Sequence, residues 1–292
     1  MKIVVSIPAY NEEKTIGSVI TNIKKVMQSF KYDFLIQVVD DGSKDHTVQE
    51  AEAAGAEVYS HPINYGLAET FRTETKQALK NNADVIVHID ADGQYLARDI
   101  PKLIKGIEKG SDLVLGNRFK GKIESMPIIK RIGNKAFSRV ISHICRKKIG
   151  DAQTGFRAFT KEVANLNIIS NHTYTQEQII RAVNEKFIVT EIPAYFARRN
   201  GKSRLLRNPF EYALKAWINI FRIYRDYEPL KFFGFIGLLF FVPGVAFGIW
   251  LLYLFSKFGF IGKTPTVLLV VLLIGIAIQI WVLGFLADMM RK

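Results

Sequence analysis

Two carboxylates stand close together in the segment Ile89–Gln94 (Ile-Asp-Ala-Asp-Gly-Gln), which directly follows the apolar run Val85–Ile89. That run, interrupted only by His88, predicts a central strand, so Asp90 and Asp92 leave its carboxyl end, where open α/β sheets bind ligands. Carboxylate oxygens suit a hard divalent cation, and Mg²⁺ commonly shares its coordination with a substrate diphosphate. The segment therefore predicts a metal–diphosphate site, with a solvated acidic turn as the alternative.

Two further polar segments also adjoin predicted strands. Val38–Ser43 (Val-Val-Asp-Asp-Gly-Ser) passes from strand to loop, and its alternative interpretation is an Asx turn with Ser43 capping the next helix. Ile7–Glu13 (Ile-Pro-Ala-Tyr-Asn-Glu-Glu) leads into the first predicted helix. In it, Tyr10 offers a ring for stacking on a base, and Glu12 offers an acceptor for a base or a ribose.

The elements that must position these segments show an alternating pattern. Short β-branched runs alternate with apolar residues at helical spacing, which is typical of a parallel sheet with crossover helices. Strands are predicted at Lys2–Ile7, Phe34–Val39, Glu57–Ser60, Val85–Ile89 and Leu113–Gly116, and helices at Lys14–Phe30, Lys44–Ala54, Leu67–Lys80 and Asp99–Lys109.

The pattern changes after Pro127. The sequence then predicts helices near 128–146 and 174–185, a loop at Gly150–Arg157, a strand at Ile188–Phe196 and a basic loop at Arg198–Arg207.

Two long runs without charge, Phe232–Phe255 and Thr266–Ala287, follow. Each is long enough to span a bilayer core of ~30 Å, and the short joining loop makes them a transmembrane hairpin. Basic residues flank the outer ends more than the loop, so both termini and the catalytic domain are expected in the cytoplasm. The preceding segment Pro209–Tyr227 is amphipathic and predicts a helix in the membrane interface, with packing on the soluble domain as the alternative.

The formal net charge of +13 favours an anionic membrane face and diphosphate ligands. No zinc-finger spacing or RNA-binding signature is present, so nucleic acid is not an expected partner. The N-terminus opens into a strand pattern without a signal-peptide run. Cys145 is the only cysteine, which excludes an intrachain disulfide, and we interpret it as a small core residue.

Taken together, in this order and at these strand ends, Pro8–Glu13, Asp40–Ser43 and Asp90–Gln94 resemble the family 2 inverting glycosyltransferases. The resemblance implies an α/β GT-A fold, a Rossmann-like and mostly parallel sheet with flanking helices. An interfacial helix and a C-terminal two-helix transmembrane hairpin would follow it. The expected domains are a transferase domain at 1–208, a juxtamembrane helix at 209–230 and the hairpin at 231–292.

Three later motifs narrow the resemblance to one branch of that family. Gly116–Phe119 (Gly-Asn-Arg-Phe) is similar to the Gly-Ser-Arg-aromatic strand end of the dolichyl-phosphate mannose and glucose synthases, with Asn replacing Ser. Asp151–Ala158 resembles the acceptor-loop motif of that branch, and Arg198–Arg204 resembles its basic segment. Asn134 stands where the branch often has Ser. The resemblance covers about residues 1–230.

The resemblance implies roles for the matching residues. The nucleotide-sugar site would comprise Pro8, Tyr10, Glu12, Asp40, Asp41 and Asp90. Metal and diphosphate would be held by Asp90, Asp92 and Gln94, with Mg²⁺ or Mn²⁺ as the cofactor. The residues assigned to transfer are Asp92, Arg118, Lys130, Arg131, Asp151, Arg199 and Lys202, of which Asp151 would order the acceptor loop while the cations face phosphates.

The implied reaction moves a sugar from a nucleotide diphosphate sugar to polyprenyl (dolichyl-type) phosphate with inversion, which makes a lipid-linked donor for protein glycosylation. A phosphate monoester is already anionic at neutral pH, so this nucleophile needs positioning and charge compensation more than a general base. Tyr174–Glu177 resembles UDP-sugar users, which favours UDP-GlcNAc or UDP-glucose over GDP-mannose. The partners would be the nucleotide sugar, the lipid phosphate and the bilayer, and a homo-oligomer stays open.

The sequence lacks the motifs that two other functions would require. A processive polysaccharide synthase would usually carry a Gln-x-x-Arg-Trp motif, and none of the three tryptophans follows an arginine. A nucleotidyltransferase would normally begin with a glycine-rich phosphate loop, which is missing. A glycolipid synthase with another lipid acceptor and a non-catalytic membrane scaffold on a transferase fold remain the alternatives.

Overall fold

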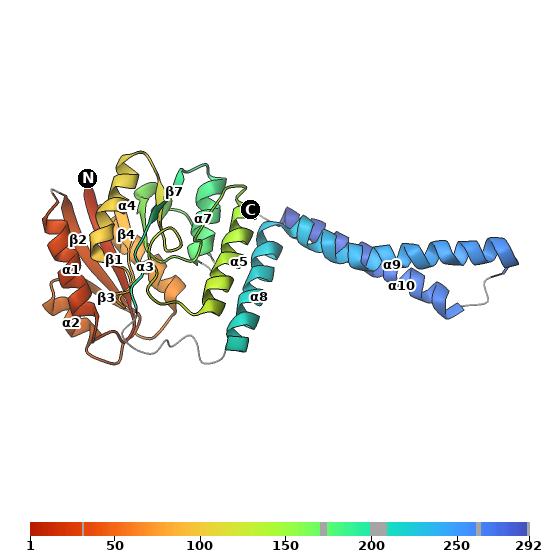
Figure 1. The fold of residues 1–292 in the computed structure, drawn as a ribbon, viewed down its shortest axis with the longest axis horizontal. Helices are drawn as coiled ribbons and strands as arrows, with labels where there is room; N and C mark the ends of the chain where they lie inside the picture. The colour runs from red at the N-terminus through yellow and green to blue at the C-terminus, as the bar shows by residue number, and fades with distance from the viewer. Residues whose placement is uncertain (31, 170–173, 199–208, 261–263, 291–292) are drawn as a thin grey trace. The chain divides into compact units, whose positions relative to one another are not determined.

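The computed structural model describes residues 1–30, 32–169, 174–198, 209–260 and 264–290. The chain divides into two compact units, Met1–Ala213 and Leu214–Lys292. Among the described residues, the first unit holds a seven-stranded sheet with helices on both faces, and the second holds two long apolar helices (Figure 1). The mostly parallel α/β architecture expected from the sequence is confirmed.

The strands stand in the order β3-β2-β1-β4-β6-β5-β7. They are β1 (Lys2–Ala9), β2 (Asp33–Asp40), β3 (Glu57–Ser60), β4 (Val85–His88), β5 (Leu113–Asn117), β6 (Arg157–Thr160) and β7 (Val189–Pro193). β6 runs antiparallel to β4 and β5, and the other neighbouring strands are parallel.

The helices of the first unit connect these strands. They are α1 (Ile16–Gln28), α2 (Thr47–Ala53), α3 (Leu67–Lys80), the 3₁₀ turn η1 (Ala97–Asp99), α4 (Ile100–Glu108), α5 (Ile128–Ile144), α6 (Lys161–Ala164) and α7 (Tyr174–Asn184), with α8 (Pro209–Tyr227) at the boundary between the units. Cys145, directly after α5, is buried as interpreted.

The two faces of the sheet differ in character. Because successive strand residues point to opposite faces, Ile3 and Val5 of β1 contribute to the apolar core that α1 and α4 cover. Ser6 faces the other side, where Gln37 of β2 donates to the Ser6 hydroxyl (2.9 Å) and to the Glu74 carbonyl of α3 (2.8 Å). The face under α3 therefore buries polar groups directly beneath the ends of the central strands.

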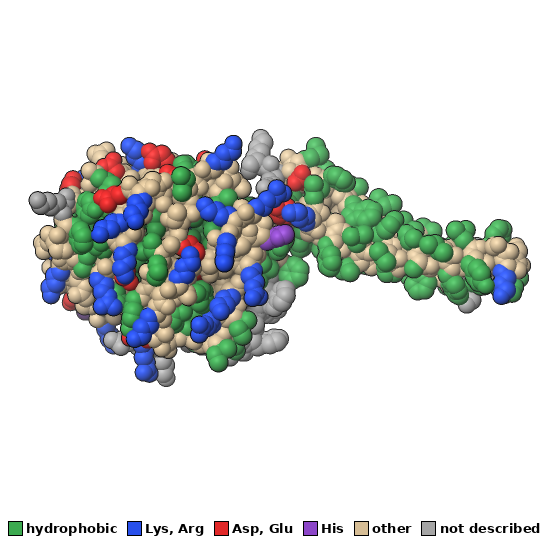
Figure 2. Space-filling model, turned by 45° about the horizontal axis from the view of Figure 1, so that its top comes forward, with side chains coloured by type: hydrophobic (Ala, Val, Ile, Leu, Met, Phe, Trp, Pro, Cys, Tyr) green, Lys and Arg blue, Asp and Glu red, His purple; other side chains and the backbone are tan. Residues whose placement is uncertain are grey.

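The second unit contains α9 (Pro229–Phe258) and α10 (Thr264–Met289), whose most apolar stretches have mean hydropathies of 2.3 and 2.8. Both helices are long and apolar enough to cross a membrane. They pack against each other, and the Trp281 indole N–H donates to the Gly234 carbonyl (3.2 Å). Figure 2 shows apolar side chains over the visible surface of this pair and basic side chains spread over the first unit.

Two local expectations were wrong. The segment that becomes β6 was not predicted as a strand, because four residues that begin with an arginine carry no clear alternation, and β6 depends on pairing with strands distant in sequence. Helix α2 begins at Thr47 instead of Lys44, and Ser43 does not cap it. The Ser43 hydroxyl instead accepts the backbone N–H of Asn11 (2.8 Å).

Candidate active site

The loops after β1 and β2 are held together by side-chain to backbone hydrogen bonds. The Asn11 N–H donates to Ser43 Oγ, and Asn11 Oδ1 accepts the N–H of the next residue, Lys44 (both 2.8 Å). The Glu12 N–H donates to Thr47 Oγ1 (2.8 Å). Pro8 is buried in β1, while Tyr10 in the loop after it is 36% exposed. Four of the predicted nucleotide-site residues thus share one edge: Pro8, Tyr10, Glu12 and Asp40.

Asp40 and Asp41 are both buried, and they do different things. The Asp40 carboxylate accepts the Ser43 N–H (3.1 Å) and shapes its own loop. The Asp41 carboxylate accepts the N–H groups of Tyr65 and Gly66 (both 2.9 Å) and contacts His61 Nδ1 (2.9 Å). Asp41 therefore ties the end of β2 to the start of α3, and its role in the nucleotide site stays a prediction.

Asp90 and Asp92 leave the carboxyl end of β4, as the sequence predicts. Burial and then repulsion from Asp92 raise the pKa of the Asp90 carboxyl, although 38% of its side-chain surface is open. Asp92 accepts the Gln94 N–H (3.0 Å), and the Gln94 side chain donates to the Ala197 carbonyl (3.1 Å). Gln94 therefore connects this loop to the segment after β7, and its role as a metal ligand stays a prediction.

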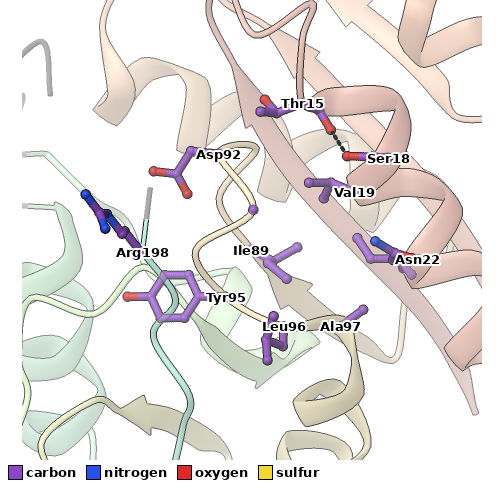
Figure 3. A pocket seen from close by; sticks show the side chains of 12 residues that line it. Thr15, Ser18, Val19, Asn22, Ile89, Asp92, Tyr95, Leu96, Ala97 and Arg198 are labelled. Carbon is purple, nitrogen blue, oxygen red and sulfur yellow. Dashed lines mark hydrogen bonds between the residues drawn. The ribbon is translucent and has the colours of Figure 1, made fainter. Parts of the chain in front are cut away.

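A recess of about 200 Å³ lies beside this loop. Figure 3 shows Asp92 and Arg198 on one side of it, and Thr15, which directly precedes α1, with Ser18 and Asn22 of α1 on the other. Arg198 is the first residue of the predicted basic segment. Arg199 and Lys202 of that segment lie outside the described residues.

Arg118 and Asp151 form a buried pair at the end of β5. Arg118 Nε and Nη2 donate to the two carboxylate oxygens of Asp151 at 2.7 and 2.8 Å, and the Arg118 backbone N–H donates at 3.1 Å. The side chains are 5% and 0% exposed. Asp151 thus fixes the loop before β6 to the end of β5, while much of the hydrogen-bonding capacity of Arg118 is directed at Asp151.

Lys130 and Arg131 lie in the first turn of α5, next to three isoleucines with large exposed fractions: Ile128 (75%), Ile129 (46%) and Ile132 (64%). Arg131 is exposed and Lys130 half-buried. Asn134, one turn further, is buried, and its side-chain oxygen can accept from Arg118 Nη2 at 3.2 Å. The N-terminal half of α5 therefore combines basic and apolar groups near the Arg118–Asp151 pair.

Sequence reasoning missed Glu191 of β7. Its carboxylate accepts the N–H groups of Gly150 (2.7 Å) and Asp151 (3.1 Å) and pairs with Lys120 Nζ (3.0 Å). It therefore fixes the loop that carries Asp151. The only available sequence signal was an acidic residue inside a predicted strand, which by itself does not indicate a contact with a loop 40 residues away.

Comparison with known proteins identifies the class. A family model described as "Glycosyl transferase family 2" matches residues 4–166, and the chain belongs to this family of glycosyltransferases. The chain is 33% identical to the UDP-N-acetylglucosamine–dolichyl-phosphate N-acetylglucosaminyltransferase of Methanococcus voltae, over 64% of this chain and 82% of that protein. It is also 33% identical to the dolichol-phosphate mannosyltransferase of Pyrococcus furiosus, over 73% of this chain and 62% of that protein.

A solved structure shares the fold. The glucosyl-3-phosphoglycerate synthase of Mycobacterium tuberculosis, crystallised with Mn²⁺, UDP-glucose and phosphoglyceric acid, has a TM-score of 0.58 at 20% identity. The match covers 75% of this chain and 79% of that one. The predicted family and its GT-A fold are therefore confirmed.

The Arg118–Asp151 pair generates a stability prediction. Asp151→Ala leaves a buried guanidinium without its anion, which should lower the free energy of unfolding by about 3–5 kcal/mol. The three tryptophans lie at positions 217, 250 and 281, so their fluorescence reports little on the sheet. Cys145 is buried at the end of α5, so its alkylation during a denaturant titration reports on the unfolding of the first unit.

Glu69→Ala is the matched control, since it breaks a partly exposed Arg72–Glu69 pair of the same unit, and pairs open to solvent contribute about 0–1 kcal/mol. Equal shifts of the Cys145 labelling midpoint in the two variants would show that the buried pair contributes no more to the free energy of unfolding than the Arg72–Glu69 pair does.

Proposed function

We propose that this glycosyltransferase moves a sugar from a nucleotide diphosphate sugar to a polyprenyl (dolichyl-type) phosphate, with inversion at the anomeric carbon. The observation that carries the proposal is the pair Asp90 and Asp92 at the carboxyl end of β4, beside the nucleotide-side loops after β1 and β2. In a family 2 transferase, this is where a diphosphate leaving group would be held.

The chemistry follows from the charges along the edge of the sheet. A phosphate oxygen of the acceptor attacks the anomeric carbon, the glycosidic bond to the diphosphate breaks, and the nucleoside diphosphate leaves. The nucleophile is already an anion, so the chain must align it and offset its charge, and Arg and Lys do both.

A divalent cation fits the oxygen donors of Asp90 and Asp92, because Mg²⁺ and Mn²⁺ accept carboxylates and share them with phosphates. Its contribution when bound is to stabilise the charge that develops on the departing diphosphate. The glucosyl-3-phosphoglycerate synthase that shares the fold was crystallised with Mn²⁺ and a UDP-sugar, which supports the assignment without fixing the metal.

A lipid phosphate is the acceptor that the relatives and the first turn of α5 favour. The relatives from Methanococcus and Pyrococcus are both named for dolichyl phosphate. Lys130 and Arg131 stand among exposed isoleucines on α5, a combination that suits an anionic headgroup with an apolar tail.

The distribution of basic residues supports a membrane topology. We place the catalytic domain (1–208) and both termini in the cytoplasm, with 209–230 at the membrane surface and 231–292 as the hairpin.

The same relatives differ in sugar, GlcNAc in one and mannose in the other. We propose UDP-GlcNAc or UDP-glucose as the donor over GDP-mannose, on the likeness of Tyr174–Glu177 to UDP-sugar users. The proposed role of the product is that of a lipid-linked sugar donor for protein glycosylation.

The function is tested with purified full-length protein, polyprenyl phosphate and radiolabelled UDP-GlcNAc, UDP-glucose and GDP-mannose. One donor should yield label that partitions into organic solvent, with inverted anomeric configuration by NMR. Polyprenol, which lacks the phosphate, should yield none because the phosphate oxygen is the nucleophile. Transfer to a diacylglycerol in place of polyprenyl phosphate would make the chain a glycolipid synthase instead.

Turnover should depend on a divalent cation and on Asp92. EDTA should abolish transfer, and Asp92→Asn should lower kcat by roughly 10²-fold or more, since the cation supplies several kcal/mol of charge stabilisation. Asp84→Asn is the control: it makes the same charge change just before β4, at the opposite end of that strand. Full turnover in EDTA, or equal effects of the two variants, would refute the metal–diphosphate assignment.

We also propose that the basic segment Arg198–Arg204 binds the phosphates, and Arg198, its only described residue, lines the recess beside Asp92. Arg199→Ala and Lys202→Ala should then lower kcat with both substrates saturating in neutral detergent, because a contact made in the transition state affects turnover. Lys147→Ala, in another exposed basic stretch, should not. Wild-type turnover combined with weaker binding to anionic liposomes would make the segment a membrane contact.

A further inference from the structure

A buried polar pair lies directly beneath the proposed diphosphate site. Glu74 of α3 and His88, the last residue of β4, are joined by a contact of 2.7 Å between Glu74 Oε2 and His88 Nδ1. The two side chains are 1% and 0% exposed. Burying such a pair is costly, and apolar residues of similar volume would often stabilise a fold equally well or better. Its presence under a candidate site therefore raises the question of what the pair does there.

The histidine ring directs its second nitrogen at Asp90. His88 Nε2 lies 3.9 Å from Asp90 Oδ1. Within the described part of the chain, Nε2 is a buried atom with no hydrogen-bond partner. The rings of Phe71 and Tyr174 pack beside the imidazole, with centroids 5.5 and 6.1 Å away. With Nδ1 engaged by Glu74 and aromatic rings alongside, the polar group that Nε2 faces is the Asp90 carboxylate.

Gly155, in the loop before β6, also lies against the Asp90 carboxylate. A Cβ placed on Gly155 would lie 2.7 Å from Asp90 Oδ1 and 3.0 Å from Oδ2. The carboxylate thus has two close neighbours, His88 and the loop before β6, and a larger residue than glycine at position 155 would displace it.

We propose that the Glu74–His88 pair is a positioning element that fixes the orientation of the Asp90 carboxylate at the metal–diphosphate site. Glu74 holds the imidazole through Nδ1, and Nε2 in turn faces the carboxylate. Groups that orient a metal-binding carboxylate or imidazole commonly change metal affinity tenfold to a hundredfold when they are removed. The inference rests on the proposed function, because it assigns the pair to the same donor site.

Two substitutions at His88 test the roles of its two ring nitrogens separately. The amide of Gln reaches the position of the histidine Nε2, so His88→Gln keeps a polar group facing Asp90. The shorter Asn places its amide near the Nδ1 position, so His88→Asn keeps a group facing Glu74 only. A merely structural role of the pair predicts that Asn is the better replacement, and a positioning role predicts that Gln is.

The readout is the affinity of the full-length protein for Mn²⁺ in the presence of UDP and, in parallel, of GDP, measured from the loss of the free Mn²⁺ signal by electron paramagnetic resonance. We expect His88→Asn to weaken the Mn²⁺–nucleotide affinity roughly ten- to a hundredfold and His88→Gln to weaken it much less. Phe159→Leu is the control for stability, because Phe159 is fully buried against Phe71 and does not adjoin Asp90. It should lower the thermal midpoint and leave the affinity unchanged.

Three results would each overturn the inference. His88→Asn could bind Mn²⁺ with wild-type affinity, or His88→Gln could bind it more weakly than His88→Asn does. The losses of affinity could also simply follow the losses of thermal midpoint. A wild-type protein that binds Mn²⁺ with neither UDP nor GDP would overturn the proposed function itself, and the inference with it. If the wild-type protein binds Mn²⁺ and transfers sugar, and His88→Asn binds Mn²⁺ with the same affinity as the wild type, the inference alone would be overturned.

Discussion

The antiparallel insertion of β6 between β4 and β5 is the constraint on which the candidate site depends. Arg157, the first residue of β6, pairs with His88 at the end of β4 and with Leu115 of β5. Because β6 runs against its neighbours, the loop that enters it arrives at the edge where β4 and β5 end. A parallel strand in this place would start at the other edge, and Asp151 and Gly155 would be a strand length away from Asp90 and Arg118.

This arrangement explains why the site is built on buried charged groups. Two sets of hydrogen bonds fix one end of the loop before β6. The Asp151 carboxylate accepts the Arg118 guanidinium N–H, and the Glu191 carboxylate accepts the N–H groups of Gly150 and Asp151. At the other end, Gly155 lies against the Asp90 carboxylate. A loop fixed at both ends can hold the proposed sugar donor and the proposed phosphate acceptor in one alignment. When the nucleophile is already charged, such alignment accounts for much of the catalysis.

The sequence predicted the position of the two acidic residues correctly, while their role in binding stays a prediction. Asp90 and Asp92 follow an apolar strand, and the rule that ligands bind at the carboxyl ends of parallel strands was enough to place them. The parallel strands and the long apolar helices were likewise predictable, because their periodicity and length are local properties.

Contacts between distant residues were not predictable. β6 has four residues and is a strand only because two neighbours pair with it, and Glu191 acts on a loop some 40 residues earlier in the chain. The early start predicted for α2 had a different cause. Ser43 is a good capping residue, but its hydroxyl is engaged by Asn11 from another loop, so a tertiary contact overrode a local preference.

Helix α3 connects the two halves of the donor side. The Asp41 carboxylate at the end of β2 accepts the N–H groups of Tyr65 and Gly66, where α3 begins. Two turns further along, Glu74 of the same helix contacts His88 at the end of β4. A displacement of α3 would therefore disturb both strand ends together, since one rigid element carries both contacts. The loop after β2 and the carboxylates after β4, which we propose to bind the nucleotide and the diphosphate, are thus both tied to one helix.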